Sequence, residues 1–149
     1  MKAIIIISGG MDSTTLLYDL VKQYKAKNLF ALSFLYGSRH MKKEIPMAQY
    51  HCKKLGVKHQ IIDVRNAFMY FKSSLLNKKD SEKIPKGHYK AKNMKSTVVP
   101  FRNGILLSIA AGFADSIEAK VIFYGAHAGD HAIYPDCRQE FRDADFDAF

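Results

Sequence analysis

Residues 4–15, IIIISGGMDSTT, decide the fold, because they join a strand-forming run directly to two glycines and then to the start of a helix. Residues 3–7 form a short, continuous run rich in β-branched side chains, which is typical of a parallel strand buried on both faces. After the glycines, residues 13–25 carry apolar side chains at helical spacing. The stretch therefore predicts a strand, a tight turn and a helix in immediate succession.

The turn has the composition of an anion-binding loop. Gly9 and Gly10 let the main chain bend tightly and let an anion approach it without a Cβ in the way. The free N–H groups and positive dipole end of the following helix attract phosphate. Hydroxyl donors flank the turn, at Ser8, Ser13, Thr14 and Thr15. We expect phosphate or pyrophosphate here; the alternative is an ordinary strand–turn–helix with a capped helix.

Two common phosphate motifs, G-x-x-x-x-G-K-[ST] and G-x-G-x-x-G, do not occur in this stretch. Without the lysine of the first motif, the loop is not expected to be specialised for transfer of a γ-phosphate. Asp12 is a carboxylate within an anion loop. It is expected either to act through Mg²⁺ bound to the phosphates or to cap the helix.

The rest of the chain alternates strand and helix patterns. Further strands are predicted at residues 29–35, 60–64 and 121–124, and further helices at residues 40–55 and 103–117. Pro46 loosens the first of these helices, Gly56 ends it, and the second is apolar enough to lie buried between layers. This order predicts an α/β fold: a doubly wound parallel sheet of about five strands with helices on both faces. Ligands of such a sheet bind at the carboxyl ends of its strands.

Composition limits the class of protein. The 149 residues, 48% hydrophobic and 25% charged, suit one domain, and the net charge of +9 favours anionic partners. Two distant cysteines predict neither a disulfide framework nor a paired-cysteine metal motif, and they favour a cytoplasmic location. No signal peptide or membrane span is predicted. Residues 77–95 hold seven lysines and are predicted to form a basic loop, either a lid or a solvated excursion.

Four motifs carry a resemblance to known proteins. SGGMDS at residues 8–13 resembles the loop of the PP-loop ATP pyrophosphatase superfamily, whose members cleave ATP between the α and β phosphates. Within that superfamily, SFLYGSRH at residues 33–40, STVVPFRN at 96–103 and GAHAGDHAIYPDCRQEF at 125–141 resemble the 7-cyano-7-deazaguanine (preQ0) synthase family. The resemblance covers residues 2–141 and implies the adenine nucleotide alpha-hydrolase-like fold as one PP-loop domain.

The resemblance implies an ATP-dependent ligase that converts 7-carboxy-7-deazaguanine and ammonia to the nitrile, in queuosine or deazapurine biosynthesis. The implied cofactors are ATP and Mg²⁺, with Asp12 reaching Mg²⁺ through the phosphates, and Asp12 and Arg102 are the implied catalytic residues. The implied ATP-binding residues are Ser8, Gly9, Gly10, Met11, Asp12, Ser13, Thr14, Thr15, Arg39, His40 and Arg102. The implied substrate-binding residues are Asn103, Gly125, Asp130, Tyr134, Asp136 and Arg138.

Several of these roles have structural alternatives. Arg102 could form a helix-end salt bridge, and Asn103 could cap its helix instead of binding substrate. Either Asp130 or Asp136 could pair with the N–H edge of a deazaguanine. Alternatively, the polar groups of this loop could form hydrogen bonds only with one another. His127 and His131 have metal-like spacing, but their loop is not expected to bind zinc.

The chain departs from the family pattern in three places. Leu35 and Ser38 stand where the family usually has Asp and Gln. Residues 142–149, RDADFDAF, form an atypical tail, and the four-cysteine zinc cluster of the family is absent from this sequence. The chain is therefore interpreted either as a truncated member or as a shortened one that works without zinc.

Two other functions stay open: a different PP-loop adenylating enzyme that modifies tRNA or protein, and a catalytically weak nucleotide-binding module. Direct binding of nucleic acid or membrane is not expected for the leading function. Because members of the family are commonly homodimers, a homodimer is also considered.

Overall fold

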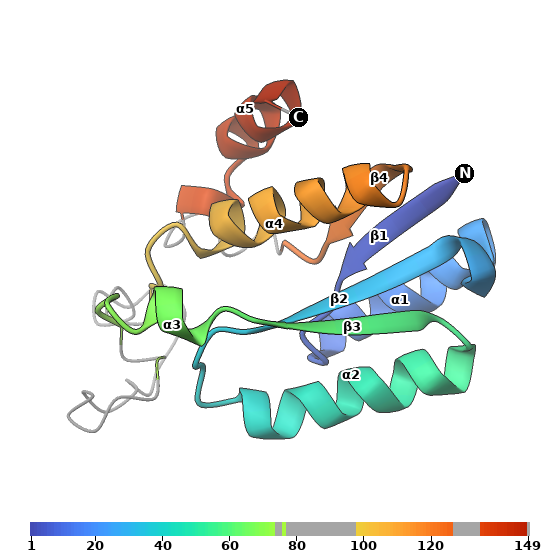
Figure 1. Ribbon diagram of the computed structural model, residues 1–149, viewed down its shortest axis with the longest axis horizontal. Coiled ribbons are helices and arrows are strands. Elements are labelled where there is room, and N and C mark those ends of the chain that lie inside the picture. The colour runs from blue at the N-terminus through green and yellow to red at the C-terminus, as the bar shows by residue number, and fades with distance from the viewer. Residues whose placement is uncertain (74–75, 77–97, 127–134, 149) are drawn as a thin grey trace.

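The computed structural model describes residues 1–73, 76, 98–126 and 135–148. Figure 1 shows one parallel sheet with helices on both of its faces. The strands are β1 (Lys2–Ile6), β2 (Leu29–Leu35), β3 (Lys58–Asp63) and β4 (Ala119–Tyr124). The helices are α1 (Met11–Tyr24), α2 (Met41–Leu55), α3 (Arg65–Phe68), α4 (Arg102–Ser116) and α5 (Gln139–Ala148), with single 3₁₀ turns η1 (Ala26–Asn28) and η4 (Pro135–Cys137).

The sheet has the order β3-β2-β1-β4, and all of its pairings are parallel. Ile5 of β1 pairs with Ala31 of β2 on one side and with Phe123 of β4 on the other. The chain thus winds outward from β1 in one direction and then returns to its other side, which confirms the doubly wound sheet. The described residues contain four strands, one fewer than the five or so that the sequence predicts.

The isoleucine run at β1 places side chains in two hydrophobic cores, one on each face of the sheet. Successive side chains of a strand point to opposite faces of the sheet. Ala3, Ile5 and Ile7 therefore pack on the face covered by α1 and α2, while Ile4 packs on the face covered by α4. Ile4, Ile5 and Ile7 are at most 1% exposed, and each contributes about 1.5–3 kcal/mol through burial. Double-sided burial explains why this strand shows no alternation of apolar and polar residues.

Helix α2 confirms the predicted stop signal. Pro46 lies inside the helix, and the helix continues through it to Leu55. Gly56 then adopts a left-handed conformation (φ 70°), which lets the N–H groups of Gly56 and Val57 bond back to the last turn of the helix. The helix therefore ends at the predicted glycine, and β3 begins two residues after Gly56.

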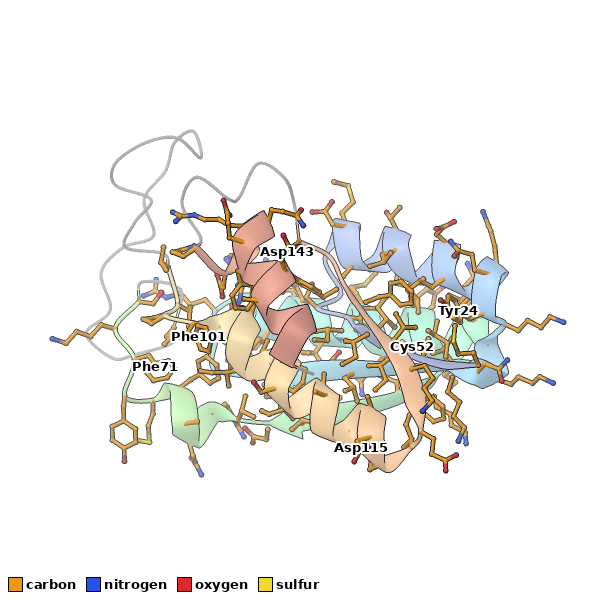
Figure 2. The ribbon with its side chains drawn as sticks, turned by 90° about the horizontal axis from the view of Figure 1, so that it is seen from above. Tyr24, Cys52, Phe71, Phe101, Asp115 and Asp143 are labelled. Carbon is orange, nitrogen blue, oxygen red and sulfur yellow. The ribbon has the colours of Figure 1, made fainter. Side chains whose placement is uncertain are left out.

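Helices α4 and α5 differ from the expectations. Helix α4 buries Leu106, Leu107 and Ala110, but Ser108, Gly112 and Asp115 are exposed, so it has a solvent face and is not enclosed between layers. Figure 2 shows Asp115 near the end of α4. Residues 139–148 form helix α5, whereas the sequence predicts an atypical tail over residues 142–149. The ring of Phe141 at its start packs edge-on against Phe101, with 5.9 Å between ring centroids.

Candidate functional site

The glycine loop between β1 and α1 is held together by its own hydroxyl groups. Ser13 Oγ accepts a hydrogen bond from the Ser8 N–H (3.2 Å) and donates one to the Gly10 carbonyl (3.2 Å). Ser8 Oγ accepts a bond from the Gly10 N–H (3.1 Å). The two serine hydroxyls therefore shape the loop, whatever else they bind.

The helix that follows this loop starts without a side-chain cap. Its N-cap residue is Gly10, and no side-chain hydrogen bond closes the end of the helix. Asp12 does not act as the cap; it lies exposed in the first turn. The first N–H groups of a helix need partners from outside the helix. This end of α1 is thus suited to an anion.

Thr14 adds an unsatisfied group to the same end of α1. Its Oγ1 atom is buried and has no hydrogen-bond partner among the described residues. Thr15 Oγ1, in contrast, donates to the Met11 carbonyl (2.9 Å). A buried hydroxyl without a partner is costly, so Thr14 fits an acceptor such as a phosphate oxygen.

Gly9 is required by the close approach of α2. It has a φ of 92°, and a Cβ at this position would overlap the backbone carbonyl of Glu44. The Glu44 carboxylate also lies near the loop, with Oε1 3.7 Å from where a Cβ on Gly10 would be. Sequence reasoning missed Glu44, because nothing in its local pattern distinguishes it from other polar residues of the helix.

Gly125 lies beside the same helix start. A Cβ at Gly125 would be 3.5 Å from the backbone nitrogen of Ser13 and 3.8 Å from the carbonyl carbon of Asp12. The loop after β4 therefore leaves the sheet in contact with the loop after β1. This is the point at which the strand order reverses, where doubly wound sheets bind their ligands.

A second cluster lies at the start of α4. Asp136, which is 6% exposed, accepts a hydrogen bond from the backbone N–H of Asn103 through Oδ2 (2.7 Å). The Asn103 amide donates in turn to the Asp136 carbonyl (3.2 Å) and to Cys137 Sγ (3.3 Å). Asn103 is therefore not the N-cap residue of α4; that position belongs to Phe101, and Asp136 supplies the missing acceptor.

Arg102 belongs to this cluster. Its Nε–H donates to Asn103 Oδ1 (3.2 Å), and its Cζ lies 6.0 Å from the centroid of the Tyr36 ring. Burial tends to lower the pKa of the Arg102 guanidinium, but the neighbouring Tyr36, Asp136 and Cys137 side chains outweigh it, and the pKa is raised. Arg102 is thus a partly buried cation at the start of α4.

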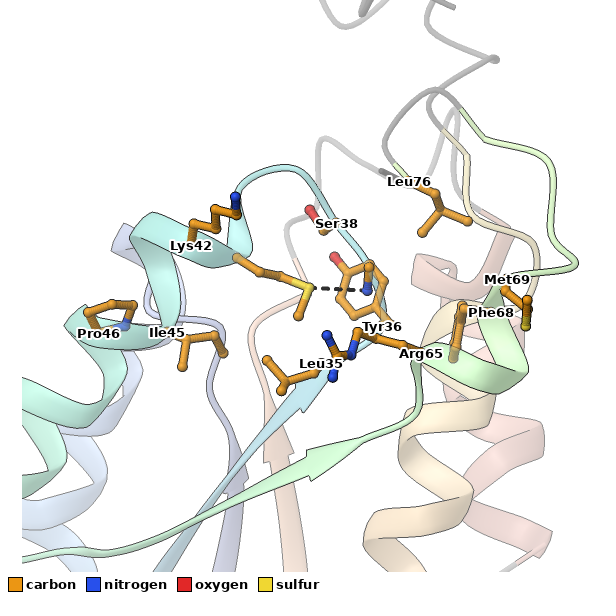
Figure 3. A pocket seen from close by; sticks show the side chains of 12 residues that line it. Leu35, Tyr36, Ser38, Lys42, Ile45, Pro46, Arg65, Phe68, Met69 and Leu76 are labelled. Carbon is orange, nitrogen blue, oxygen red and sulfur yellow. Dashed lines mark hydrogen bonds between the residues drawn. The ribbon is translucent and has the colours of Figure 1, made fainter. Parts of the chain in front are cut away.

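Tyr36 also lines a cavity of about 730 Å³ at the carboxyl ends of β2 and β3 (Figure 3). The cavity is mainly apolar and is lined by Leu35, Tyr36, Gly37, Ser38, Met41, Lys42, Ile45, Pro46, Arg65, Phe68, Met69 and Leu76. The charge of Arg65 is already paired with Asp63 (2.6 Å). Sequence reasoning placed Arg39 and His40 at the site and missed Tyr36, which stands three residues earlier in the same motif.

The contacts of the remaining predicted site residues, within the described ranges, do not assign them a role. Arg39 is half-buried and His40 is exposed, and the backbone N–H of His40 donates to Ser38 Oγ (3.3 Å). Met11 is 81% exposed. Arg138 is exposed, and its backbone N–H bonds to the Pro135 carbonyl (3.2 Å). Asp130, Tyr134, His127, His131 and the basic loop at 77–95 lie outside the described residues.

Within the described ranges, no three His, Cys, Asp or Glu side chains are grouped to hold a metal ion. Asp12 is the carboxylate on the first turn of α1, and it lies exposed at the uncapped start of that helix. None of the described helices has both the length and the hydropathy to cross a membrane.

The chain is a doubly wound parallel α/β protein with the serine- and glycine-rich loop SGGMDS after its first strand, which is the arrangement of the PP-loop fold. A solved structure supports the fold: the U34-tRNA thiolase NcsA from Methanococcus maripaludis with its [4Fe-4S] cluster matches with a TM-score of 0.54 at 18% identity, over 85% of this chain and 39% of that one. The profile of the family described as "Queuosine biosynthesis protein QueC" matches residues 2–147. The chain belongs to this family.

Close relatives agree with this assignment. The chain is 51% identical to a 7-cyano-7-deazaguanine synthase of Desulfotalea psychrophila over 144 residues, 52% identical to one of Hahella chejuensis over 140, and 50% identical to one of Caldicellulosiruptor bescii over 144. These alignments cover 94–97% of this chain but only 58–64% of the relatives. The chain thus spans about three fifths of their length.

Proposed function

We propose that this chain carries the ATP-binding half of a 7-cyano-7-deazaguanine synthase reaction, in which a carboxylate is activated by adenylation. The observation that carries the proposal is the uncapped start of α1, where the Thr14 hydroxyl has no partner among the described residues. Family membership and the names of the relatives support the particular substrate.

The proposed reaction uses two molecules of ATP. An oxygen of 7-carboxy-7-deazaguanine attacks the α-phosphate, and pyrophosphate leaves. Ammonia then displaces AMP from the acyl adenylate and gives the amide. The amide oxygen is adenylated in the same way by the second ATP, and loss of AMP and a proton leaves the nitrile.

The glycine loop is suited to the leaving pyrophosphate. Backbone N–H groups at the start of α1, together with the Thr14 hydroxyl, would donate hydrogen bonds to its oxygens as negative charge builds up on them. Gly9 lets α2 pack directly against the loop, and Gly125 lets the chain after β4 lie against the start of α1, so both glycines fix the position of these donors. Donors already in position stabilise this charge without further rearrangement.

Asp12 is the residue proposed to hold Mg²⁺ together with the phosphates, since it is an exposed carboxylate on the first turn of α1. When bound, Mg²⁺ neutralises charge on the phosphate oxygens. Arg102 is proposed to contact a phosphate or the substrate carboxylate, because its guanidinium is a permanent cation at the start of α4, held by Asn103 and Tyr36.

The test is mass spectrometry of the purified chain incubated with ATP, Mg²⁺, ammonium and 7-carboxy-7-deazaguanine. Asp12→Ala is the test variant and Asp19→Ala the matched control, because both residues are exposed carboxylates on α1. Nitrile and AMP from the wild type and Asp19→Ala, with at least about a hundredfold less from Asp12→Ala, support the proposal.

Two other outcomes contradict it. ATP binding without release of AMP would make the chain a nucleotide-binding module. Release of AMP only when tRNA or a protein acceptor is added would place the chain with a different PP-loop activity.

A further inference from the structure

We propose that Tyr36 and Asp136 are positioning residues that together hold the Arg102 guanidinium in place for an anionic ligand at the carboxyl edge of the sheet. The identity of that ligand, a phosphate or carboxylate of the reaction, rests on the proposed function. The placement of Arg102 itself does not, because it follows from the contacts of Arg102 with Tyr36 and Asn103 and from the contact of Asn103 with Asp136.

The three residues come from separate parts of the chain. Tyr36 follows β2, Arg102 is the first residue of α4, and Asp136 belongs to η4, after β4. Helix α4 starts at the carboxyl edge, because it runs antiparallel to the strands it covers (Figure 1). The cluster therefore lies on the edge where doubly wound sheets bind ligands.

Asp136 controls where Arg102 lies along the helix. Through Oδ2 it accepts the backbone N–H of Asn103, and the Asn103 amide bonds back to the Asp136 carbonyl. These two bonds join η4 to the first turn of α4 across 33 residues of sequence. Since Arg102 precedes Asn103 directly, its backbone is held by the same contact.

Asn103 then orients the side chain. Its Oδ1 accepts the Nε–H of Arg102, while its Nδ2 group donates to the Asp136 carbonyl. The amide of Asn103 therefore links Asp136 to the guanidinium. A side chain held in this way loses less conformational freedom when it binds a ligand.

Tyr36 holds the guanidinium from the other loop. The Arg102 Cζ lies 6.0 Å from its ring centroid, within range of a cation–π interaction. Figure 3 shows Tyr36 among the residues of the cavity, next to Leu35 and Ser38. A guanidinium has five N–H donors, more than the Asn103 amide and the Tyr36 hydroxyl can accept, so with respect to the described residues Arg102 has donors to spare for an anion.

Burial argues for a positioning role for Asp136 over direct pairing with a substrate. Asp136 is 6% exposed, and Oδ2 is already bonded to the main chain. The charge of the Asp136 carboxylate favours the charged form of Arg102, and its contact with Asn103 fixes the amide that accepts the Arg102 Nε–H. Asp136 therefore acts on Arg102 through Asn103.

The first experiment measures the geometry without needing activity. The Arg102 Nε–Hε signal in a ¹⁵N NMR spectrum is identified by its loss in Arg102→Lys. Exchange of this proton with water is expected to quicken at least about tenfold in Tyr36→Leu and in Asp136→Asn, because the hydrogen bond to Asn103 loosens. The matched controls are Tyr50→Leu and Asp115→Asn, which alter an exposed tyrosine of α2 and an exposed aspartate of α4. Unchanged exchange in both test variants overturns the proposal.

The second experiment uses the reaction. Guanidinium chloride should raise AMP formation by Arg102→Ala about tenfold, because the vacated site still binds a guanidinium. Adding Tyr36→Leu or Asp136→Asn to that variant should abolish the rescue, whereas Tyr50→Leu should leave it intact. A purely structural role would lower the melting temperature without affecting rescue, so equal rescue in all variants also overturns the proposal.

The two failures can be told apart. If the wild type forms no AMP under any condition, the proposed function fails. The exchange experiment still tests the positioning role of Tyr36 and Asp136. Titration with ATP and with pyrophosphate, followed by the Arg102 Nε–Hε signal, tests whether the guanidinium binds an anion. No shift of that signal with either ligand overturns the anionic-ligand part of the inference.

Discussion

Gly9, in the loop after β1, lies directly against the backbone carbonyl of Glu44 in α2. The contact leaves no room for a Cβ, and the φ of 92° is one that residues with a side chain rarely adopt. The glycine loop therefore takes its shape from a helix that begins about thirty residues later in the chain, and its geometry depends on the packing of α2 beside α1 and β2.

Gly9→Ala should be strongly destabilising for both of these reasons. We expect the free energy of unfolding to fall by about 4 kcal/mol or more. Gly56→Ala is the matched control, because Gly56 also has a positive φ (70°) but has nothing within 4 Å of an added Cβ. It should cost only about 1–2 kcal/mol. Urea unfolding followed by circular dichroism measures both; similar losses would show that the contact with Glu44 is unimportant.

Thr14→Val should separate stability from ligand binding. The hydroxyl of Thr14 is buried without a partner among the described residues, so its replacement by a methyl group should raise the melting temperature slightly. Affinity for ATP should fall at least about tenfold, because a hydrogen bond to a charged phosphate is lost. Calorimetry and thermal unfolding test the two effects, with Ser108→Ala on the exposed face of α4 as control. Unchanged affinity would remove Thr14 from the site.

His59 should make the fold sensitive to mild acid. Its Nε2 atom lies 2.8 Å from Ser33 Oγ, which donates to the Ile7 carbonyl (2.6 Å) at the end of β1. Burial lowers the pKa of His59 below its ordinary 6.5, because burial disfavours the imidazolium. The unfolded chain then binds the proton more readily than the folded one, so stability is fully present above pH 6.5 and is lost as the pH falls through the lowered pKa.

The measurement is urea unfolding at about pH 7.5 and pH 5.5. His59→Gln, which keeps a donor toward Ser33, should lose less stability between the two values than the wild type does. His40→Gln changes an exposed histidine and serves as control. An equal pH dependence in the wild type and His59→Gln would contradict the assignment.

Cys52 should be chemically inert in the folded protein. It is 1% exposed, within the core between α2 and the sheet (Figure 2), and burial raises the pKa of its thiol to about 11. The reactive thiolate is therefore scarce near neutral pH. In Cys137→Ser, which leaves Cys52 as the single thiol, reaction with a thiol reagent should be undetectable at about pH 8 until urea unfolds the chain. Rapid labelling without urea would show that the α2 face opens.

Much of the fold could be predicted from local patterns. Strand β2 spans the predicted residues 29–35, because its mainly apolar run starts after Lys27 and Asn28 and leads to Gly37. Helix α2 ends at the predicted glycine, whose left-handed conformation closes the last turn. Helix α5 was not predicted, because it is short and four of its ten residues are acidic, so its apolar positions do not stand out in the sequence.

In the candidate site, too, some features follow from the local sequence and others from the packing of distant residues. The sequence by itself determined the glycine loop, the order of strands and helices, and the family, since these depend on residues that are neighbours in the chain. Only the tertiary structure decided that Glu44 packs on Gly9, that Asp136 caps α4, and that Tyr36 contacts Arg102. Residues separated by 33 or more positions, as Asn103 and Asp136 are, meet because the sheet and its helices pack in one way, and local patterns do not encode that packing.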